Sequence, residues 1–169
     1  SGYHKQNATA EVECSDQTSG VGRVNATHGP SSNSSDVNLT LTKRGNNAIE
    51  FVCLDQAGNQ DNEFRDVAVD RRPPQINGTI PENLSTTGRD TDVMVDIQDV
   101  SGLNSSSVQL SANGAGATAS ADGNAVDIQV NGANPGDKYA LKLSVSDILN
   151  QSSVFVLRYK AKTEGGPDD

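Results

Sequence analysis

The strongest constraint on the fold is an alternation of apolar and polar residues that recurs along almost the whole chain. It is clearest in the segments 10–14, 49–53, 93–97, 126–130 and 139–145. A period of two residues places one set of side chains on each face of a β-strand, which is typical of half-buried antiparallel strands. Clusters of Gly, Pro, Asn and Ser separate the segments, as turns require. Because no segment sustains an apolar stripe of helical period, the pattern predicts an all-β chain.

An internal repeat predicts that this β-structure is built twice. The segment Asp16-Gln-Thr-Ser-Gly-Val recurs as Asp99-Val-Ser-Gly-Leu, and Asp55-Gln-Ala-Gly-Asn-Gln recurs as Asp147-Ile-Leu-Asn-Gln. Two copies of roughly 75–95 residues fit tandem Ig-like antiparallel β-sandwich domains. The second copy lacks the glycine of the later motif, so its turn is expected to be tighter or differently shaped.

Composition favours two small cores over one large core. Only 33% of the 169 residues are hydrophobic and 4% are aromatic, with no Trp, which is too little to line one wide core. We expect an Ig-like domain at 1–72, a second at 73–162 and a flexible linker at 163–169. The pair Pro73-Pro74 ends strand pairing and predicts a stiff, extended joint between the domains.

The two cysteines occupy equivalent places in the repeat. Cys14 lies two residues before Asp16, and Cys53 lies two residues before Asp55. The second copy has Ile97 and Val145 at these positions, which predicts an inward-facing pair. A disulfide between Cys14 and Cys53 would close a loop of about 40 residues and stabilise the domain by roughly 2–4 kcal/mol. Such a bond indicates an oxidising, extracellular compartment.

Charge and motifs exclude several classes of function. The net charge of −9 argues against nucleic acid as a partner. The sequence has no apolar run near the roughly 20 residues that a membrane-spanning helix needs, so the chain is not expected to span a membrane itself. It has two His, no Gly-x-Ser-x-Gly elbow and no phosphate-binding Gly loop, so no nucleophile can be paired with a base. We expect no catalytic residues, no enzyme activity and no cofactor, with calcium as the one candidate ion.

The Asp-containing turns admit two interpretations. Calcium takes six to eight oxygen ligands, which loop carboxylates and amides can supply. The candidate ligands are Asp16, Asp55, Asn59, Asp61, Asp99 and Asp147, with Asn150 as the expected counterpart of Asn59. Asp and Asn are also favoured in turns because they hold backbone N–H groups, which needs no ion; this second interpretation is the simpler one.

Eight Asn-x-Ser/Thr sequons are candidate glycosylation sites in an extracellular setting. They are Asn7, Asn25, Asn33, Asn38, Asn77, Asn83, Asn104 and Asn150. A chain rich in Asn, Ser and Thr also produces such triplets by chance.

The stretch from Asp55-Gln-Ala-Gly-Asn to Val69-Asp-Arg-Arg-Pro-Pro-Gln-Ile76 resembles the prokaryotic Ig-like repeats of cell-surface proteins. Asp55, Ala57, Gly58 and Asn59 match the turn of those repeats, and the strand end and Pro74-x-Ile76 match their joint. The resemblance implies a module of an adhesin, an S-layer-like protein or another bacterial or archaeal surface protein. Together with 16 Asp against 6 Lys, it suggests a haloarchaeal envelope protein; an ordinary acidic secreted surface explains the same bias.

The sequence therefore predicts a non-catalytic, extracellular stalk or spacer, whose partners are the neighbouring domains of a larger surface protein. The alternative is an adhesin-type module that recognises a glycan or a surface protein through its loops at 29–36 and 112–124. Sugar sites usually need exposed aromatic residues, and Phe51, Tyr139, Phe155 and Tyr159 fall in strand patterns that predict burial. Tyr3 and Phe64 are the aromatic residues less firmly placed.

Overall fold

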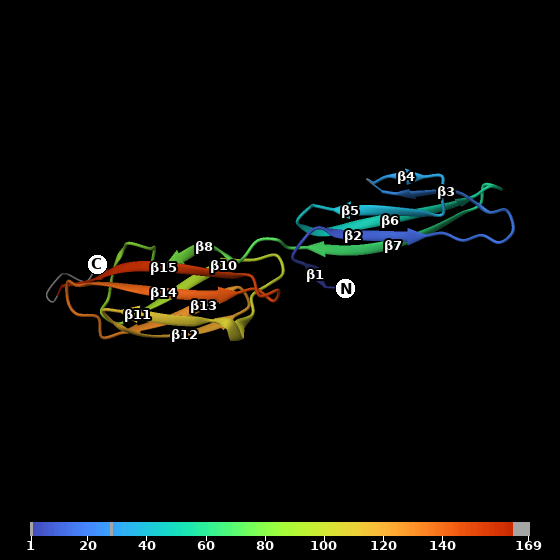
Figure 1. The fold of residues 1–169 in the computed structure, drawn as a ribbon. Coiled ribbons are helices and arrows are strands. Elements are labelled where there is room, and N and C mark those ends of the chain that lie inside the picture. The colour runs from blue at the N-terminus through green and yellow to red at the C-terminus, as the bar shows by residue number, and fades with distance from the viewer. Residues whose placement is uncertain (1, 28, 164–169) are drawn as a thin grey trace. The chain divides into compact units, whose positions relative to one another are not determined.

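A computed structural model describes residues 2–27 and 29–163, and the chain divides into two compact units between Arg71 and Arg72. Each unit consists of two layers of β-strands (Figure 1). The prediction of an all-β chain with two tandem Ig-like antiparallel sandwiches is confirmed. Of the linker predicted at 163–169, all but Thr163 lies outside the described residues.

The first unit packs a larger sheet against a two-stranded one. The larger sheet has the strand order β1 (Tyr3–His4), β7 (Gln60–Val69), β6 (Gly45–Asp55), β3 (Val21–Ala26) and β4 (Ser31–Ser32). The second sheet pairs β2 (Ala8–Glu13) with β5 (Asp36–Leu41). The pairs β3–β6, β6–β7 and β2–β5 are antiparallel, whereas β1 runs parallel to the end of β7.

The second unit has two four-stranded sheets. One has the order β11 (Gln109–Asn113), β14 (Lys138–Ser146), β15 (Ser152–Ala161) and β9 (Thr86–Thr87). The other has the order β12 (Gly116–Asp122), β13 (Ala125–Asn131), β10 (Thr91–Gln98) and β8 (Gln75–Ile80). A short 3-10 turn, η1 (Ser105–Ser107), precedes β11. The short β9 runs parallel to the end of β15, as β1 does to β7 in the first unit.

The core of the second unit follows the alternation in the sequence. Val93, Val95 and Ile97 of β10 are fully buried, and they belong to the same cluster as Leu141 and Leu143 of β14 in the other sheet. Each such side chain contributes about 1.5–3 kcal/mol when it leaves water.

The core of the first unit is smaller and rich in alanine. Its buried members are Ala8, Ala10, Val12, Cys14, Val24, Ala26, Val37, Leu41, Ile49, Phe51 and Val69. Phe51 is the largest of them and has no solvent exposure. Because so little apolar volume is available, we expect a covalent link between the sheets to add substantially to this unit's stability.

The prediction of a loop at 112–124 is wrong for the central part of that segment. Residues Gly116–Asp122 form β12, which pairs along its whole length with β13. Ala117, Ala119 and Ala121 face the core, and the residues between them are exposed. Alanine is too weak an apolar signal to make this alternation visible in the sequence. Within the other predicted loop, Ser31–Ser32 forms the short strand β4.

Candidate functional site

A disulfide joins the two sheets of the first unit. Cys14 directly follows β2, and Cys53 lies in β6 of the larger sheet. Their Cα atoms are 6.0 Å apart and the bond spans 39 positions of sequence. The Cys14 N–H also donates to the Ser35 carbonyl at 2.7 Å, which holds the end of β2 beside the start of β5. In the second unit, Ile97 and Val145 are buried in the core at the equivalent positions, as the repeat predicted.

One carboxylate oxygen of Asp16 organises the turn that follows the disulfide. Asp16 Oδ1 accepts hydrogen bonds from the backbone N–H groups of Thr18, Ser19 and Gly20, at 3.0, 2.6 and 2.8 Å. The Ser19 hydroxyl oxygen lies 3.2 Å from the same oxygen. Gly20 has φ of +76°, where residues with a side chain are strained. A short carboxylate that satisfies nearby backbone donors is a typical Asp turn.

Asp55 closes the second turn, between β6 and β7, in a similar way. Its Oδ1 accepts from the Asn59 backbone N–H at 2.7 Å, and its Oδ2 accepts from the Asn59 side-chain amide at 2.6 Å. The Gly58 N–H donates to the Asp55 carbonyl at 3.3 Å, and Gly58 has φ of +90°. Asn59 therefore serves as a partner of Asp55 through both its backbone and its amide nitrogen.

The two turns are bonded to each other. The Gln56 N–H donates to the Gly20 carbonyl at 3.0 Å, and the Ser19 hydroxyl donates to Asp55 Oδ2 at 2.9 Å. A Cβ added to Gly22 would lie 2.8 Å from the Asp55 carbonyl oxygen, so glycine is required where the turns meet. The bridging role of Ser19 was not predicted. Its place directly before the turn glycine was the available signal, because Ser101 precedes Gly102 in the same way.

Hydrogen bonds to the ionised carboxylates lower the pKa of both Asp16 and Asp55. The backbone N–H of Ser19, followed by that of Gly20, holds the pKa of Asp16 below its ordinary value. The side-chain amide of Asn59 is the main cause of the lowered pKa of Asp55. Both carboxylates are therefore held in the charged form by the turns that they organise.

The first unit is expected to lose stability in acid. A group whose folded pKa is depressed stabilises the fold above its unfolded pKa, and that contribution is lost as the pH falls through the folded pKa. For Asp16 and Asp55 the loss begins below about pH 4, the unfolded value of an aspartate. Thermal melts between about pH 6 and pH 3 should show a falling midpoint for the first unit, with a shallower fall in Asp16→Asn. An unchanged slope in that variant would contradict the role of Asp16.

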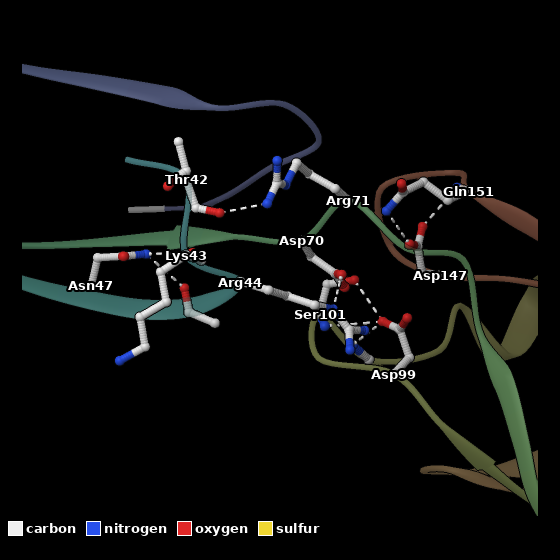
Figure 2. A network of polar contacts seen from close by, with 12 residues as sticks. Thr42, Lys43, Arg44, Asn47, Asp70, Arg71, Asp99, Ser101, Asp147 and Gln151 are labelled. Atoms are coloured by element: carbon white, nitrogen blue, oxygen red, sulfur yellow. Dashed lines mark hydrogen bonds and ion pairs between the residues drawn. The ribbon is translucent and has the colours of Figure 1, made fainter. Parts of the chain in front are cut away.

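The second unit repeats the arrangement with different side chains. Asp99 Oδ1 accepts from the N–H groups of Ser101 and Gly102 at 2.9 and 3.0 Å. Asp147 accepts from the Gln151 N–H at 2.7 Å on Oδ1 and from the Gln151 amide at 2.7 Å on Oδ2 (Figure 2). The Ile148 N–H donates to the Gly102 carbonyl at 3.1 Å, which links the two turns as Gln56 does in the first unit.

The expectation of a tighter or different second turn is wrong. The Asp147 N–H donates to the Gln151 carbonyl, as the Asp55 N–H does to the Asn59 carbonyl, so the two turns have the same length. Asn150 has φ of +59° and occupies the place of Gly58. Asn tolerates this left-handed conformation better than other residues with side chains. The structural counterpart of Asn59 is therefore Gln151, and not Asn150.

The structure brings the calcium candidates of the first unit to one end of the sandwich. Asp16, Asp55, Asn59 and Asp61 border a shallow pocket of about 160 Å³ beside the disulfide. Each of the three carboxylates already accepts a hydrogen bond on at least one oxygen, and Asp61 Oδ1 accepts from the Asn62 N–H at 3.0 Å. A shared ion would need one oxygen from each of Asp16, Asp55 and Asp61, all within about 4.8 Å of one another. Among the residues that the structure describes, these three carboxylates do not form such a group.

We therefore expect the first unit to melt at the same temperature in calcium and in EDTA, since an ion that does not bind the folded state does not stabilise it. Calorimetry of the oxidised protein measures this directly. A higher midpoint for the first unit in calcium would make Asp16, Asp55, Asn59 and Asp61 ligands. In the second unit, oxygens of Asp99 and Asp147 lie within 4.8 Å of each other, and calcium binding there stays a prediction for the same experiment.

The sequons lie on the surfaces of both units, and their glycosylation stays a prediction. Asn25 and Asn104 are half-buried, whereas the remaining sequon residues are exposed. The side chain of Asn83 accepts from the Arg158 N–H at 2.7 Å, and that of Asn77 donates to Asp96 at 2.7 Å.

Comparisons with known proteins place the fold without assigning a family. No protein-family model matches the chain, and no curated protein matches it. The human desmocollin-1 ectodomain is similar with a TM-score of 0.53 and 13% identity, over 99% of this chain and 36% of that one. This similarity shows the fold alone.

Two further solved structures are similar at lower scores. The insect immune protein hemolin gives a TM-score of 0.45 at 11% identity, over 96% of this chain and 44% of that one. The fibronectin(III)-like modules of Clostridium thermocellum CbhA give 0.38 at 10% identity, over 99% and 93% of the two chains. Within residues 2–27 and 29–163, no helix is long and apolar enough to cross a membrane.

Proposed function

We propose that the chain is a non-catalytic stalk or spacer segment of an extracellular surface protein, and that it holds neighbouring domains apart. The observation that carries the proposal is the use of the acidic residues. In both units the repeated Asp side chains bond to the backbone N–H groups of their own turns. These Asp carboxylates, which could otherwise bind a ligand or an ion, thus stabilise the turns at the ends of the sandwiches.

The joint between the units supports a stiff spacer, because its flanks are fixed within each unit. Asp70 ends the first unit with an ion pair to Arg44 at 2.9 Å, and its N–H donates to the His4 carbonyl at 2.9 Å. Figure 2 shows the Arg71 guanidinium donating to the Thr42 carbonyl. In the second unit, the Ser153 hydroxyl donates to the Pro74 carbonyl at 2.6 Å.

Positions 71 and 74 are therefore bonded within their own units, and two residues, Arg72 and Pro73, separate them. A joint this short that contains proline restricts φ and limits the freedom of the chain. This supports a spacer that transmits position and force rather than a hinge. The disulfide adds to the proposal because it fits an extracellular compartment and limits how far the first unit can extend.

The proposed setting is the envelope of a bacterium or archaeon, in an adhesin, S-layer-like or related surface protein. The resemblance of the segment from Asp55 to Ile76 to prokaryotic Ig-like repeats supports this setting. The excess of Asp over Lys in the chain, 16 against 6, suits a high-salt habitat, where hydrated carboxylates keep the protein soluble.

One observation favours a second candidate, an adhesin-type module that binds a glycan. Phe64 on β7 is 73% exposed and borders a hollow of about 330 Å³ with Ile49, Glu50 and Arg65. An exposed aromatic ring beside polar groups is a common feature of sugar sites.

A binding screen separates the two candidates. The oxidised chain and its Phe64→Ala variant are passed over arrays of glycans and of surface proteins. A spacer shows no saturable partner in either form. Saturable binding that Phe64→Ala removes, with the melting temperature unchanged, would overturn the stalk and establish the adhesin-type module.

A further inference from the structure

The second unit separates its charges between its two sheets. All charged residues in the strands of the β8–β10–β12–β13 sheet are acidic: Asp92, Asp96, Asp122 and Asp127. All charged residues in the strands of the β9–β11–β14–β15 sheet are basic: Lys138, Lys142, Arg158 and Lys160. All eight are exposed. We call the outward surfaces of these sheets the acidic face and the basic face.

The basic residues form one patch, because the strand register places them beside one another. Lys138 lies directly opposite Lys160, Arg158 lies opposite Ala140, and Lys142 lies opposite Val156. Like charges directly opposite each other are destabilising in a sheet. No ion pair within 4.0 Å involves these four side chains in the described part of the chain. The unit therefore maintains a repulsive arrangement that a partner of opposite charge would relieve.

The acidic face has a matching arrangement. Met94 lies opposite Asp127, and Asp92 lies opposite Gln129. Asp122 lies opposite Ala125, the residue that also pairs with Asp96. The four carboxylates thus occupy three neighbouring strands, and the strands of this sheet contain no Lys, Arg or His.

Each face also exposes an apolar pair among its charges. On the acidic face, Met94 and Ile80 are cross-strand partners that are 42% and 65% exposed, and they border one hollow with Asp96. On the basic face, Val154 and Val156 are 55% and 40% exposed, and Val154 borders a hollow with Lys142. An apolar centre with a charged rim is the usual composition of a protein–protein interface.

The first unit shows that this separation is not a property of the whole chain. Its larger sheet carries both signs, and Arg65 pairs with Glu63 on the same strand at 2.7 Å. Mixed charge is the ordinary state of a soluble surface. The second unit departs from this mixed pattern. Its basic face occurs in a chain whose net charge is −9.

We propose that the acidic face of the second unit binds the basic face of the second unit in another copy of this chain. The two faces of one sandwich point in opposite directions, because they are the outer surfaces of two sheets packed on one core. They therefore cannot meet within one molecule. The contact joins different patches on the two copies, so it is heterologous and can continue from copy to copy as an open array.

The electrostatics explain why the second copy is the favoured occupant. The charges of each face are opposite in sign to those of the other face. Each face also exposes an apolar pair that can pack against the apolar pair of the other. A four-stranded face of this length covers roughly 500 Å², from strand spacings of about 4.8 Å and rises of about 3.3 Å per residue. That area is below the roughly 800 Å² per partner of a stable complex. The contact between two copies is therefore weak, and arrays gain strength from repetition.

The test measures self-association of the full chain by sedimentation velocity at increasing concentration. Wild-type protein is expected to associate in about 0.05 M salt, and at least tenfold more weakly in about 1 M salt, where the Debye length falls to about 3 Å. The double variants Lys142→Glu/Arg158→Glu and Asp92→Lys/Asp127→Lys should each lose the association. Each variant keeps one face fully charged, whereas the four charges of its altered face sum to zero.

A mixture of the two double variants provides the sharpest result, since each now complements the other. The mixture is expected to associate although neither variant does so alone. Matched controls change the net charge equally in the first unit: Lys5→Glu/Arg23→Glu and Glu11→Lys/Glu13→Lys should associate as wild type does. Thermal melts establish that all the variants are folded.

Three results would overturn the proposal. The first is a wild-type chain that stays monomeric up to about 1 mM in low salt, which corresponds to binding weaker than about 4 kcal/mol. The second is a mixture of the double variants that stays monomeric. The third is association that survives Asp92→Lys/Asp127→Lys. Binding of dextran sulfate that only Lys142→Glu/Arg158→Glu removes, without self-association, would assign the basic face to an anionic polymer instead.

Discussion

Reduction of the Cys14–Cys53 disulfide is expected to lower the free energy of unfolding of the first unit by about 2–4 kcal/mol. The bond spans 39 positions, so its loss frees a long loop in the unfolded chain. The core of the first unit is small and rich in alanine, so it buries little apolar surface to offset that loss. Calorimetry with and without reductant should therefore show the first transition at a lower temperature and the second transition in its original place.

The second unit suggests the matched control. It holds Ile97 and Val145 where the first unit holds the two cysteines, so Cys14→Ile/Cys53→Val replaces the covalent link by the apolar pair. This variant should melt above the reduced wild type and below the oxidised one. Equal midpoints for oxidised and reduced wild type would contradict the stabilising role of the bond.

Truncation of Phe51 should have a comparable or larger effect. Phe51 is fully buried in β6 and lies opposite Ala26 of β3, so Phe51→Ala leaves a cavity that small neighbours cannot fill. Such substitutions cost about 3–5 kcal/mol. Denaturant unfolding of the oxidised protein measures the loss, and we expect it to be confined to the first unit.

Phe64 supplies the control for that substitution, because it lies on the neighbouring strand β7 and is 73% exposed. Phe64→Ala should change the free energy of unfolding by no more than about 0.5 kcal/mol. Equal effects of the two substitutions would mean that Phe51 does not anchor the core.

Alternation in the sequence predicted the fold wherever the apolar residues are large. Val93, Val95 and Ile97 show the period of two plainly, and all three are fully buried. The strand β12 escaped prediction because its inward residues are Ala117, Ala119 and Ala121, whose small side chains contrast little with Thr and Ser.

The sequence was sufficient to predict which Asp residues form the turns of the candidate site, but not all of their hydrogen-bond partners. The repeat located Asp16, Asp55, Asp99 and Asp147, yet it aligned Asn59 with Asn150. The correct equivalence of Asn59 with Gln151 depends on the left-handed conformation of Asn150, which replaces a glycine. The sequence could not reveal this because either Gly or Asn can occupy such a position. The separation of charge in the second unit also requires the sheet order, since only that order shows that the strands with Asp and the strands with Lys and Arg belong to different sheets.

Single-molecule stretching of the chain from its two ends tests the proposed stalk most directly. We expect two separate unfolding events, one for each unit, when the protein is oxidised. Reduction should lengthen the event of the first unit by roughly 130–140 Å, the reach of the released 39-position loop at 3.3–3.6 Å per residue. One merged event, or a first-unit step that reduction does not lengthen, would contradict a stalk of two units with a disulfide-limited first unit.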